Sequence, residues 1–500
     1  MNALLSQVVE IDGEGWLRVV RMFVTTQPSE QHARPALTHP KHAQYRGQQC
    51  ARIHGRARSS AAMDFFNILT GPELLQVTEA HLPEHRERLY PPTVTLAMFL
   101  RQALASDGSC QRAVNGWAAS RAAEGLSAQS IRTGGYCRAR SRLPLSMLQA
   151  LTRESGRLLS TRAHGGWRWR DRHVKLLDGT GISMPDTPSN QAAFPQPACQ
   201  AEGVGFPLAR LCSVHCLASG AVLAAATGPF RGAGHSELDL SRTLLGALSA
   251  GEVLLADALY ANYWFIADLL AAGVEVVLRQ HGSRRTDFRR GERLAHRDHA
   301  VLWEKPRSVP AWMSPERYHA YPQQLRLREA QVGGRIIVTS LLDARETPKQ
   351  ALAQLYHKRW QIELDLRCIK TTLGMEVLRC LSPPMVEKEL WAHLLAYNLI
   401  RLLMAQAAAE HGTTPRALSF KHTVQIWSEF TSRAALHHAD PDAALTALFR
   451  LIAQVPTGQR PCRSEPRARK RRPKSFPWLK VPRHVARQRS HHLPNWLRAK

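Results

Sequence analysis

Between Leu355 and Leu373, apolar residues recur at helical spacing and predict an amphipathic helix. At about 100° per residue these apolar positions fall on one stripe, which is typical of a helix packed against a core. They are Leu355, Ile362, Leu366, Ile369 and Leu373. Beside the stripe, an arc about 60° wide carries a second set of side chains. This set is Tyr356, Arg359, Glu363 and Lys370, so one helical face is predicted to hold a carboxylate among cations.

That charged face has two interpretations. Cations on both sides of Glu363 favour its ionised form, and an ionised glutamate on a rigid helix suits a divalent metal ion beside a phosphate. A solvated face with ordinary i,i+4 ion pairs has the same pattern. The fifteen residues from Tyr356 to Lys370 alone do not decide between the two.

Upstream of this helix, short apolar runs predict strands. The run His173–Leu177 leads to Asp178 and then to a glycine-rich turn at Gly179–Gly181, which places Asp178 at the end of a strand. The runs Leu211–Leu217 and Ala221–Thr227 are separated by a short turn and predict a hairpin. The first part of the sheet is therefore expected to be an antiparallel meander.

A βαβ pattern follows the meander. We predict a helix over Ser236–Leu248, a strand over Gly251–Ala256 that ends on Asp257, a helix over Tyr263–Ala272 and a strand over Gly273–Leu278. Strands that alternate with helices in this way indicate an α/β fold. A second aspartate is again expected where a strand ends.

The flanking segments differ in pattern. Residues 64–159 are predicted to be helical, and small helical domains of this kind often bind DNA, although a plain helical scaffold fits equally well. Residues 280–334 lose the helical period, are rich in arginine and contain two strand candidates, after which Arg335–Leu342 returns as a strand. Three later helices are expected: one that starts at Thr347 as N-cap with Gln350 as capping-box partner, one over Val386–Glu410, and one over Pro441–Gln454 capped by Asp440.

Charge narrows the class of partner. The 500 residues carry a formal net charge of +27, which points to a polyanion, with nucleic acid as the first candidate. No apolar run is long enough to span a membrane, and the N-terminus has no signal-peptide pattern, so we expect a cytoplasmic protein. The basic run Arg467–Arg472 fits contact with a DNA backbone, or a solubilising tail.

The nine cysteines form no C-x-x-C pair, so they indicate neither a disulfide framework nor a zinc ribbon. The nearest approach to a metal cluster is Cys212, His215 and Cys216. Their apolar neighbours predict a buried strand, in which cysteine acts as a small hydrophobic residue.

Asp178, Asp257 and Glu363 together suggest one chemistry. If the fold brings them together, three carboxylates can hold two Mg²⁺ ions about 3.5–4 Å apart, and such a pair activates a water or 3′-hydroxyl for attack on a phosphodiester. Taken singly, Asp178 could be a turn residue that caps Gly179, and Asp257 could be a helix N-cap. Their joint placement on two strands and a helix, with the basic balance of the chain, favours metal-dependent cutting or joining of nucleic acid.

With these residues in place, the chain resembles the insertion-sequence DDE transposases with an RNase H-like core, in the subgroup with the Tyr-Arg-Glu-Lys signature, the fourth insertion-sequence family. The spacing of Tyr356, Arg359, Glu363 and Lys370 matches that signature without a gap. The likeness also includes the segments around Asp178 and Asp257 and the run Trp391–Arg401, and it extends over about residues 63–483.

The resemblance implies roles for individual residues. Asp178, Asp257 and Glu363 would bind two Mg²⁺ ions, or Mn²⁺, and Tyr356, Arg359 and Lys370 would contact phosphates of the transposon end. Trp303 and Trp312 are candidates to stabilise a flipped base, the alternative for each being a core tryptophan. Relatives commonly continue the second aspartate with glycine and an aromatic residue, whereas Asp257 is followed by Ala258 and Leu259, which leaves room for a decayed copy.

The resemblance also implies a domain order and a function. The expected fold class is α/β, an RNase H-like core with a β-rich insertion before the last catalytic helix and a small helical N-terminal domain. The expected parts are a disordered extension (1–62), a helical DNA-binding domain (63–160), the first part of the core (161–279), the insertion (280–334), the second part of the core (335–410), a helical region (411–456) and a disordered basic tail (457–500). We expect a cut-and-paste transposase that acts on terminal inverted repeats and target DNA, as a homodimer in the synaptic complex. The alternatives are a non-catalytic DNA-binding descendant and an RNase H-like nuclease.

Overall fold

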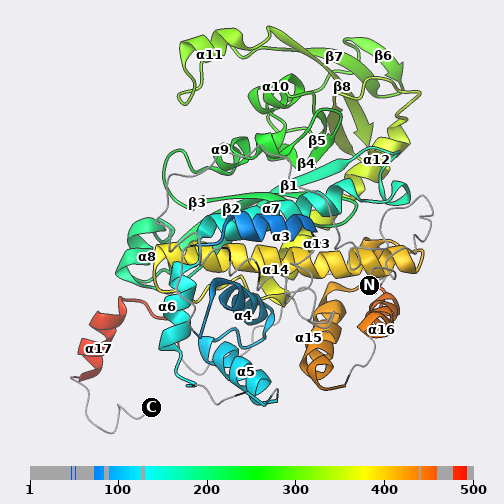
Figure 1. The fold of residues 1–500 in the computed structure, drawn as a ribbon. Coiled ribbons are helices and arrows are strands. Elements are labelled where there is room, and N and C mark those ends of the chain that lie inside the picture. The colour runs from blue at the N-terminus through cyan, green and yellow to red at the C-terminus, as the bar shows by residue number, and fades with distance from the viewer. Residues whose placement is uncertain are drawn as a thin grey trace.

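The computed structural model describes residues 47, 51, 72–83, 89–123, 125–126, 130–437, 441–458 and 477–491. Most of residues 1–62, Asp440 and the run Arg467–Arg472 lie outside these ranges, as do the expectations made for them. The fold is mixed α/β, as expected, with one large mixed sheet and helices on both of its faces (Figure 1). In the described ranges, no helix has the length and apolar character needed to cross a membrane.

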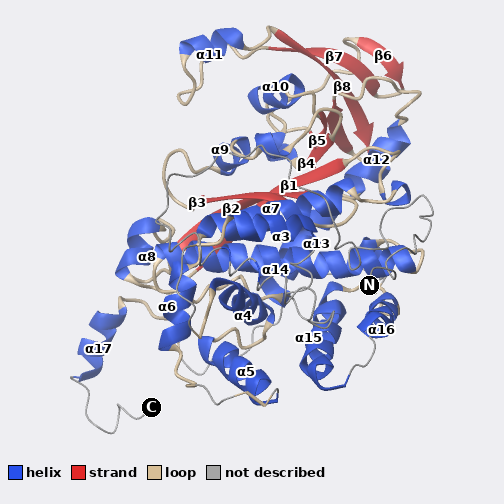
Figure 2. Ribbon diagram, in the orientation of Figure 1, coloured by secondary structure: helices blue, strands red, loops and turns tan. Residues whose placement is uncertain are grey.

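One sheet of nine strands, coloured red in Figure 2, organises the molecule, in the order β3-β2-β1-β4-β5-β9-β8-β7-β6. The strands are β1 (Val174–Ser183), β2 (Leu208–Cys216), β3 (Val222–Pro229), β4 (Val253–Ala256), β5 (Glu275–Arg279), β6 (Glu292–Ala295), β7 (Asp298–Glu304), β8 (Gln324–Val332) and β9 (Arg335–Thr339). Strands β1, β4 and β5 are parallel to one another, and every other neighbouring pair is antiparallel. The predicted meander and βαβ unit are confirmed, and β6–β8 extend the same sheet beyond β9.

Helices account for most of the remaining chain. They are α3 (Pro72–Ala80), α4 (Pro92–Leu104), α5 (Cys110–Ala123), α6 (Gly134–Arg142), α7 (Leu145–Thr161), α8 (Pro188–Ala193), α9 (Glu237–Arg242), α10 (Tyr263–Ala271), α11 (Pro315–Ala320), α12 (Lys349–His357), α13 (Trp360–Arg367), α14 (Pro383–Glu410), α15 (Phe420–His437), α16 (Pro441–Ala453) and α17 (Arg483–His491). Short 3₁₀ segments are η1 (Gly165–Trp167), η2 (Leu245–Ala247), η3 (Ala258–Tyr260) and η5 (Pro415–Ala417), and η4 (Cys368–Thr372) is a π-helical turn.

Alternating side chains of the central strands give the sheet two buried faces. On one face, Leu177, Leu254 and Val276 pack in a core with residues of α9 and α10. On the other face, Leu176 and Leu255 pack against α12 and α13, and further along the sheet β2 and β3 pack against α7 and α14. The helix that carries Glu363 is therefore held directly against the strands that carry the two aspartates.

Strand β1 is longer than predicted, and this corrects the placement of Asp178. The strand continues through Gly179 and Gly181 to Ser183 because β2 pairs with it along this whole stretch, from Lys175↔Cys216 to Ser183↔Leu208. Asp178 therefore lies inside β1 rather than at its end, and the predicted glycine-rich turn is wrong. Pairing with β4 ends earlier, at Leu176↔Leu255, so Asp178 lies just beyond the last parallel pair.

The amphipathic helix predicted around Glu363 is interrupted, which corrects the single-helix prediction. Helix α12 ends at His357, and the chain then tightens, because Arg359 donates its amide to the carbonyl of Tyr356 three residues back at 3.1 Å. Helix α13 follows, and η4 then widens the turn at Cys368–Thr372. A tight turn and a π-turn displace the helical phase in opposite senses, so side chains on both sides of the breaks still face the sheet.

Other boundaries also differ from the prediction. Helix α12 begins at Lys349 with Pro348 at its N-cap, so the capping box predicted for Thr347 and Gln350 is wrong. Thr347 is buried, and its carbonyl accepts a hydrogen bond of 2.7 Å from Arg328. Helix α9 stops at Arg242, six residues before the predicted end at Leu248, although Ser236 caps it in a full capping box with Asp239. The two long C-terminal helices are confirmed as α14 and α16.

Candidate active site

Asp178 and Asp257 come from neighbouring parallel strands. Leu176 of β1 pairs with Leu255 of β4, and each aspartate lies two residues further along its own strand. Asp257 follows directly on the last residue of β4. Because the paired strands run in the same direction, the two carboxylates emerge side by side at the carboxyl edge of the parallel sheet.

The Asp178 carboxylate is in an environment that disfavours its charge. Burial, together with the negative charges of Glu237 and Asp257, raises the pKa of Asp178 to about 7, against the opposing effects of the Gly179 amide and of Arg359. The Gly179 amide donates to Oδ1 at 2.8 Å, and no Lys, Arg or His of the described chain forms an ion pair with this carboxylate. Asp178 is therefore a largely buried acid whose ionised form a nearby positive charge would stabilise.

Asp257 also caps the short turn that follows it. Its Oδ1 accepts the amide of Leu259 at 2.8 Å and so begins η3. The N-cap interpretation of Asp257 is thus confirmed as geometry, and it does not exclude the second interpretation, because a carboxylate has a second oxygen and further lone pairs to offer. The Ala258–Leu259 sequence closes this turn as a 3₁₀ segment.

Glu363 lies on α13, which packs against β1, and its partner is a cation. Arg359 donates to its Oε1 at 2.7 Å across one helical turn. The positive charge of Arg359 also lowers the pKa of Asp178. In this arrangement Glu363 is neutralised by Arg359.

The other two signature residues lie around this edge. Lys370 donates to the hydroxyl of Thr180 on β1 at 3.1 Å, two residues beyond Asp178. Tyr356 is largely buried, and burial raises the pKa of its hydroxyl against the nearby Arg359 and Arg279. The fold therefore assembles a tyrosine and two cations around the aspartates, although they come from three separate helical segments.

The types of these side chains suit a divalent cation, but their positions do not form a complete set of ligands. Carboxylate oxygens are the donors that Mg²⁺ prefers, and the unpaired charge at Asp178 and Asp257 would be balanced by such an ion. Within the described ranges, however, no three His, Cys, Asp or Glu side chains are arranged to hold a metal ion. Glu363, held by Arg359, is the acid that must move for the predicted set to close.

Glu237 is an acid of this region that the sequence did not single out. It is the first residue of α9, and its charge contributes to the raised pKa of Asp178, while burial and the charge of Asp257 raise its own pKa. No signature spacing includes it. The available signals were the Ser236–Asp239 capping box, which marks a helix start, and the glycine beside Asp178, which leaves room for another side chain.

The two candidate tryptophans lie in different environments. Trp303 on β7 is only 4% exposed, its indole donates to Glu329 at 2.7 Å, and Arg284 covers its ring at 3.9 Å. This matches the core alternative for Trp303. Trp312 is 43% exposed and has Arg242 over its ring at 3.8 Å, so its surface is open to a partner.

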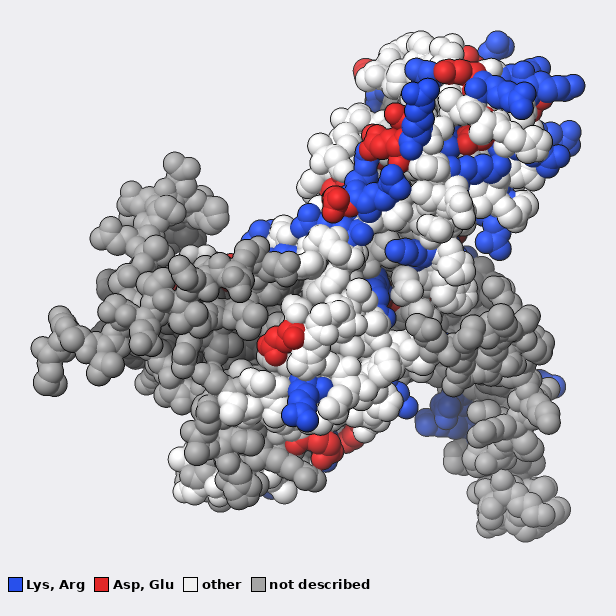
Figure 3. All heavy atoms as spheres, turned by 90° about the vertical axis from the view of Figure 1, so that its right-hand side faces the viewer, with Lys and Arg blue, Asp and Glu red and all other residues white. Residues whose placement is uncertain are grey.

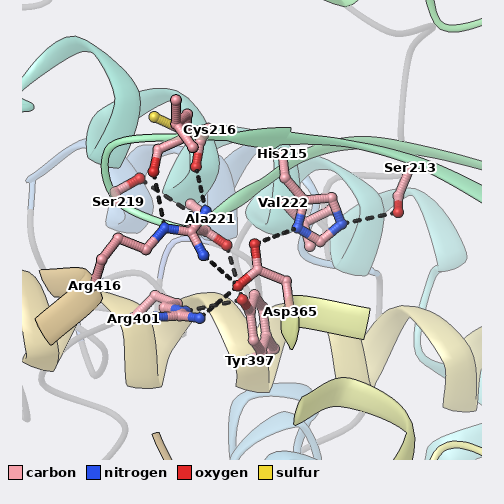
Figure 4. A network of polar contacts seen from close by, with 12 residues as sticks. Ser213, His215, Cys216, Ser219, Ala221, Val222, Asp365, Tyr397, Arg401 and Arg416 are labelled. Carbon is pink, nitrogen blue, oxygen red and sulfur yellow. Dashed lines mark hydrogen bonds and ion pairs between the residues drawn. The ribbon is translucent and has the colours of Figure 1, made fainter. Parts of the chain in front are cut away.

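Behind the candidate active site, α13 is anchored by a buried ionic network (Figure 4). Asp365 is fully buried, and one of its oxygens accepts from Arg401 and from Arg416 at 2.6 Å each. His215 Nδ1 lies 3.5 Å from the other oxygen, a contact that is ionic only when the imidazole is protonated. Arg416 also donates to the carbonyl of Leu217, and so links α13 to the end of β2.

This network also settles the Cys212, His215 and Cys216 motif. All three residues lie on β2 and are buried. Cys212 and Cys216 belong to the core beneath α9 and α10, whereas His215 contacts Asp365 on the opposite face. The predicted buried strand is confirmed, with the histidine in a polar network.

Basic side chains gather around β6–β8. Figure 3 shows lysine and arginine side chains crowded over the upper part of one face, which is the region of these strands in Figure 1. Arg289 and Arg290 belong to this region and are 90% and 83% exposed. The positive charge predicted for residues 280–334 is therefore displayed at the surface.

Comparison with known proteins gives the class of this one. Residues 169–399 match the transposase DDE domain family. The chain is 29% identical over 322 residues to the transposase InsG of insertion sequence element IS4 from Escherichia coli (strain K12), a match that covers 62% of this chain and 70% of that protein. The chain is thus similar to DDE transposases, and among them to that of the insertion sequence IS4. This confirms the resemblance and the predicted function, that of a transposase.

A solved structure with some likeness is the cryo-EM structure of a piggyBac transposase synaptic complex with hairpin DNA. It is 10% identical, the match covers 85% of this chain and 87% of that one, and the TM-score is 0.37. At this TM-score the likeness supports no conclusion about this chain.

Proposed function

We propose that this transposase cuts DNA at terminal inverted repeats and joins the freed 3′-hydroxyls to target DNA by metal-dependent phosphodiester chemistry. The observation that carries the proposal is the pair of acids at the edge of the parallel strands. Asp178 and Asp257 emerge side by side without a cationic partner in the described chain, and α13 holds Glu363 against the same strands. Acids left uncompensated in a partly buried site are typical of a centre that binds cations.

The fold supports an RNase H-like core within this proposal. Three antiparallel strands, β3-β2-β1, are followed by the parallel strands β4 and β5, and helices cover both faces. We propose the same domain order as in the sequence analysis, with residues 161–279 and 335–410 as the two parts of the core, residues 280–334 as the insertion and residues 63–160 as the N-terminal domain.

Asp178, Asp257 and Glu363 would hold Mg²⁺, as two ions, or Mn²⁺ in their place. When bound, such ions lower the pKa of an attacking water or hydroxyl and stabilise the leaving oxygen of the phosphodiester. The carboxylates themselves fix where positive charge gathers. Since Asp178 and Asp257 extend from adjacent strands, their spacing is set by the backbone of the sheet rather than by flexible loops.

Arg359 links DNA binding to this centre. Its guanidinium is shared between Glu363 and the neighbourhood of Asp178, and a DNA phosphate is an equally suitable partner for it. A phosphate that takes over Arg359 would release the Glu363 carboxylate toward the two aspartates. Lys370 and Tyr356 would contact further phosphates, and the exposed Trp312 is the candidate to stack a displaced base.

The proposed partners follow from the same surfaces. The basic region around β6–β8 fits the backbone of a transposon end or target duplex. Synapsis of two ends requires two copies of the chain, so we propose a homodimer on DNA, acting in the bacterial cytoplasm at the nucleoid.

A cleavage assay on the cognate inverted repeats tests the proposal. Asp178→Asn, Asp257→Asn and Glu363→Gln should each reduce Mg²⁺-dependent cutting by at least about 10³-fold, because each removes a charge from the site, while binding to the same DNA persists. Glu202→Gln removes one charge from an exposed loop and serves as the matched control. Full cutting by any of the three acid variants would remove that residue from the centre, and cutting without joining of ends would indicate a nuclease.

A further inference from the structure

The loop that joins β5 to β6, residues 280–291, is tied to the sheet by one buried acid. Glu329 on β8 has a side chain that is only 2% exposed. Its Oε1 accepts Nε of Arg284 at 3.0 Å and the indole N–H of Trp303 at 2.7 Å, and its Oε2 accepts the hydroxyl of Thr286 at 2.6 Å. Burial would raise the pKa of Glu329, but the hydrogen bonds from Thr286, Trp303 and Arg284 lower it below its usual value, so the carboxylate stays ionised.

The first half of this β5–β6 loop is also fixed by its own residues. The side-chain amide of Gln280 donates to the carbonyl of Arg284 at 2.9 Å, and its Oε1 lies 2.9 Å from the hydroxyl of Thr286. The guanidinium of Arg284 stacks on the ring of Trp303 at 3.9 Å. Two side chains of the loop, Arg284 and Thr286, are therefore used inward, against the sheet.

The second half of the loop is fixed against β7. Nδ1 of His299 donates to the carbonyl of Arg290 at 2.6 Å, and the ring of Phe288 packs on the His299 ring with 4.9 Å between centroids. Gly291 has a φ of +76°, and a Cβ atom there would lie 2.2 Å from the carbonyl oxygen of Ala300. The loop thus ends in a close backbone approach to β7 that a side chain at position 291 would prevent.

The outer side of the loop carries cations that face solvent. Arg285 is exposed, and the side chains of Arg289 and Arg290 are 90% and 83% exposed. Asp287 is the one acid in the sequence of this loop, and its two oxygens accept Nε and Nη2 of Arg289 at 2.9 and 3.1 Å. A phosphate can accept the same two-pronged contact, and an exposed ion pair of this kind is weak enough to exchange for one.

We infer that the β5–β6 loop is a preformed binding site for the DNA backbone, and that Glu329 is the positioning residue that holds its arginines ready. This inference rests on the proposed binding of DNA. A surface loop is ordinarily mobile, and ordering it on binding lowers affinity. Here the contacts to Glu329 order the loop when the chain folds. Because arginines on phosphates do not distinguish sequences, the loop should hold any duplex.

A purely structural role for Glu329 makes a different prediction. In that case Glu329→Gln would lower the free energy of unfolding but leave the DNA affinity of the folded chain unchanged. Glutamine keeps the size of the side chain and an oxygen that can accept Trp303, but it loses the ion pair with Arg284. Thr286→Val is a milder second variant, because it removes one hydrogen bond from the same loop and leaves Glu329 in place.

The experiment measures binding of the full chain to a duplex of unrelated sequence over a series of KCl concentrations. Replacing Arg289 and Arg290 together by glutamine should lower the slope of log affinity against log salt by about 2, one for each phosphate contact. Glu329→Gln should weaken binding by about tenfold and Thr286→Val by about threefold, each with a smaller slope than the native chain, because the loop must then be ordered on binding.

The matched control is Glu252→Gln. Glu252 is another largely buried glutamate in an ion pair, with Lys175 at 3.1 Å, and it lies outside the loop. This variant should bind the duplex with the native affinity and the native slope. Circular dichroism at the assay temperature confirms that each variant is folded, and Thr286→Val decides the matter if Glu329→Gln does not fold.

The outcomes separate this inference from the function beneath it. If the double arginine variant lowers the slope while folded Glu329→Gln and Thr286→Val bind as the native chain does, Glu329 has no positioning role and the inference fails. It fails also if the double arginine variant binds with native affinity and slope, although the native chain then still binds DNA elsewhere. If the native chain binds no duplex, the proposed function fails with it.

Discussion

Two acids, Asp365 on α13 and Asp178 on β1, have opposite surroundings. Asp365 is fully buried, yet Arg401 and Arg416 each hold it at 2.6 Å. Burial alone would raise the pKa of Asp365, but Arg416, Arg401 and His215 together keep that pKa well below its usual range. Asp178 is partly buried, forms no ion pair in the described chain, and has a pKa raised to about 7 by burial and by its acidic neighbours.

The difference separates a charge that is paired within the chain from a charge for which we propose a functional role. At Asp365 the sequence supplies two arginines from α14 and η5, so the charge cross-links three parts of the fold. At Asp178 it supplies two further acids, Glu237 and Asp257, so negative charge accumulates. A fold tolerates this accumulation where a cation from outside the chain completes the site.

The largest expected effect on stability comes from changing Asp365, the acid that is paired with two arginines. Asp365→Asn leaves Arg401 and Arg416 buried without a counter-charge, and we expect the free energy of unfolding at pH 7 to fall by about 3–5 kcal/mol. Urea unfolding measures it. The control is Glu346→Gln, whose exposed pair with Arg172 should contribute at most about 1 kcal/mol. A loss below that value for Asp365→Asn would show that the network does not stabilise the fold.

The next effect has the opposite sign and depends on pH. Because the pKa of Asp178 is raised, its contribution favours folding below about pH 4 and is lost as the pH rises through about 7. Asp178→Asn removes that loss, so the metal-free variant should gain about 2 kcal/mol relative to the native chain between pH 4 and pH 8. Urea unfolding at both pH values tests this. Equal stability of the two proteins at pH 8 would mean that Asp178 is not in an unfavourable environment.

The smallest effect on stability comes from breaking the ion pair of Arg359 and Glu363. Arg359 and Glu363 are partly exposed i,i+4 partners, so Arg359→Gln should lower the free energy of unfolding by no more than about 0.5 kcal/mol. Its effect on DNA should be far larger, because the guanidinium is proposed to grip a phosphate. Filter binding to the cognate ends compares the variant with Arg172→Gln, which changes a partly exposed arginine outside the signature. Similar DNA affinity for both variants would contradict the proposed role of Arg359.

Much of the fold follows from local sequence patterns. The apolar runs before Asp257 and in β2, β3 and β5 predict strands because these strands are buried and bounded by turn residues. The prediction that β1 ends at Asp178 was wrong, because the strand is extended by pairing with a distant segment, which a local pattern does not show. The glycines after Asp178 suggest a turn, but pairing with β2 as far as Ser183 supplies the hydrogen bonds that keep the segment extended.

The site shows the same division. The spacing of Tyr356, Arg359, Glu363 and Lys370 identifies the signature, but it does not reveal that the helix breaks after His357 or that Arg359 holds Glu363. For Trp303, the pattern leaves base stacking and core packing open. Glu329 on the neighbouring strand accepts its indole N–H and leaves it buried.

By itself, the sequence determined the mixed α/β class of the fold and the basic character that suits DNA, and it predicted three acids as the candidate site, because these depend on residue type, periodicity and spacing. Tertiary structure alone decided which acids are paired with a positive charge. Asp365 looks like any charged residue on a helix until Arg401 and Arg416 arrive from segments 36 and 51 residues away. Glu237 looks like any acid at a helix start until Gly179 admits it beside Asp178. Charge compensation is a property of distance in space, and only the folded chain fixes those distances.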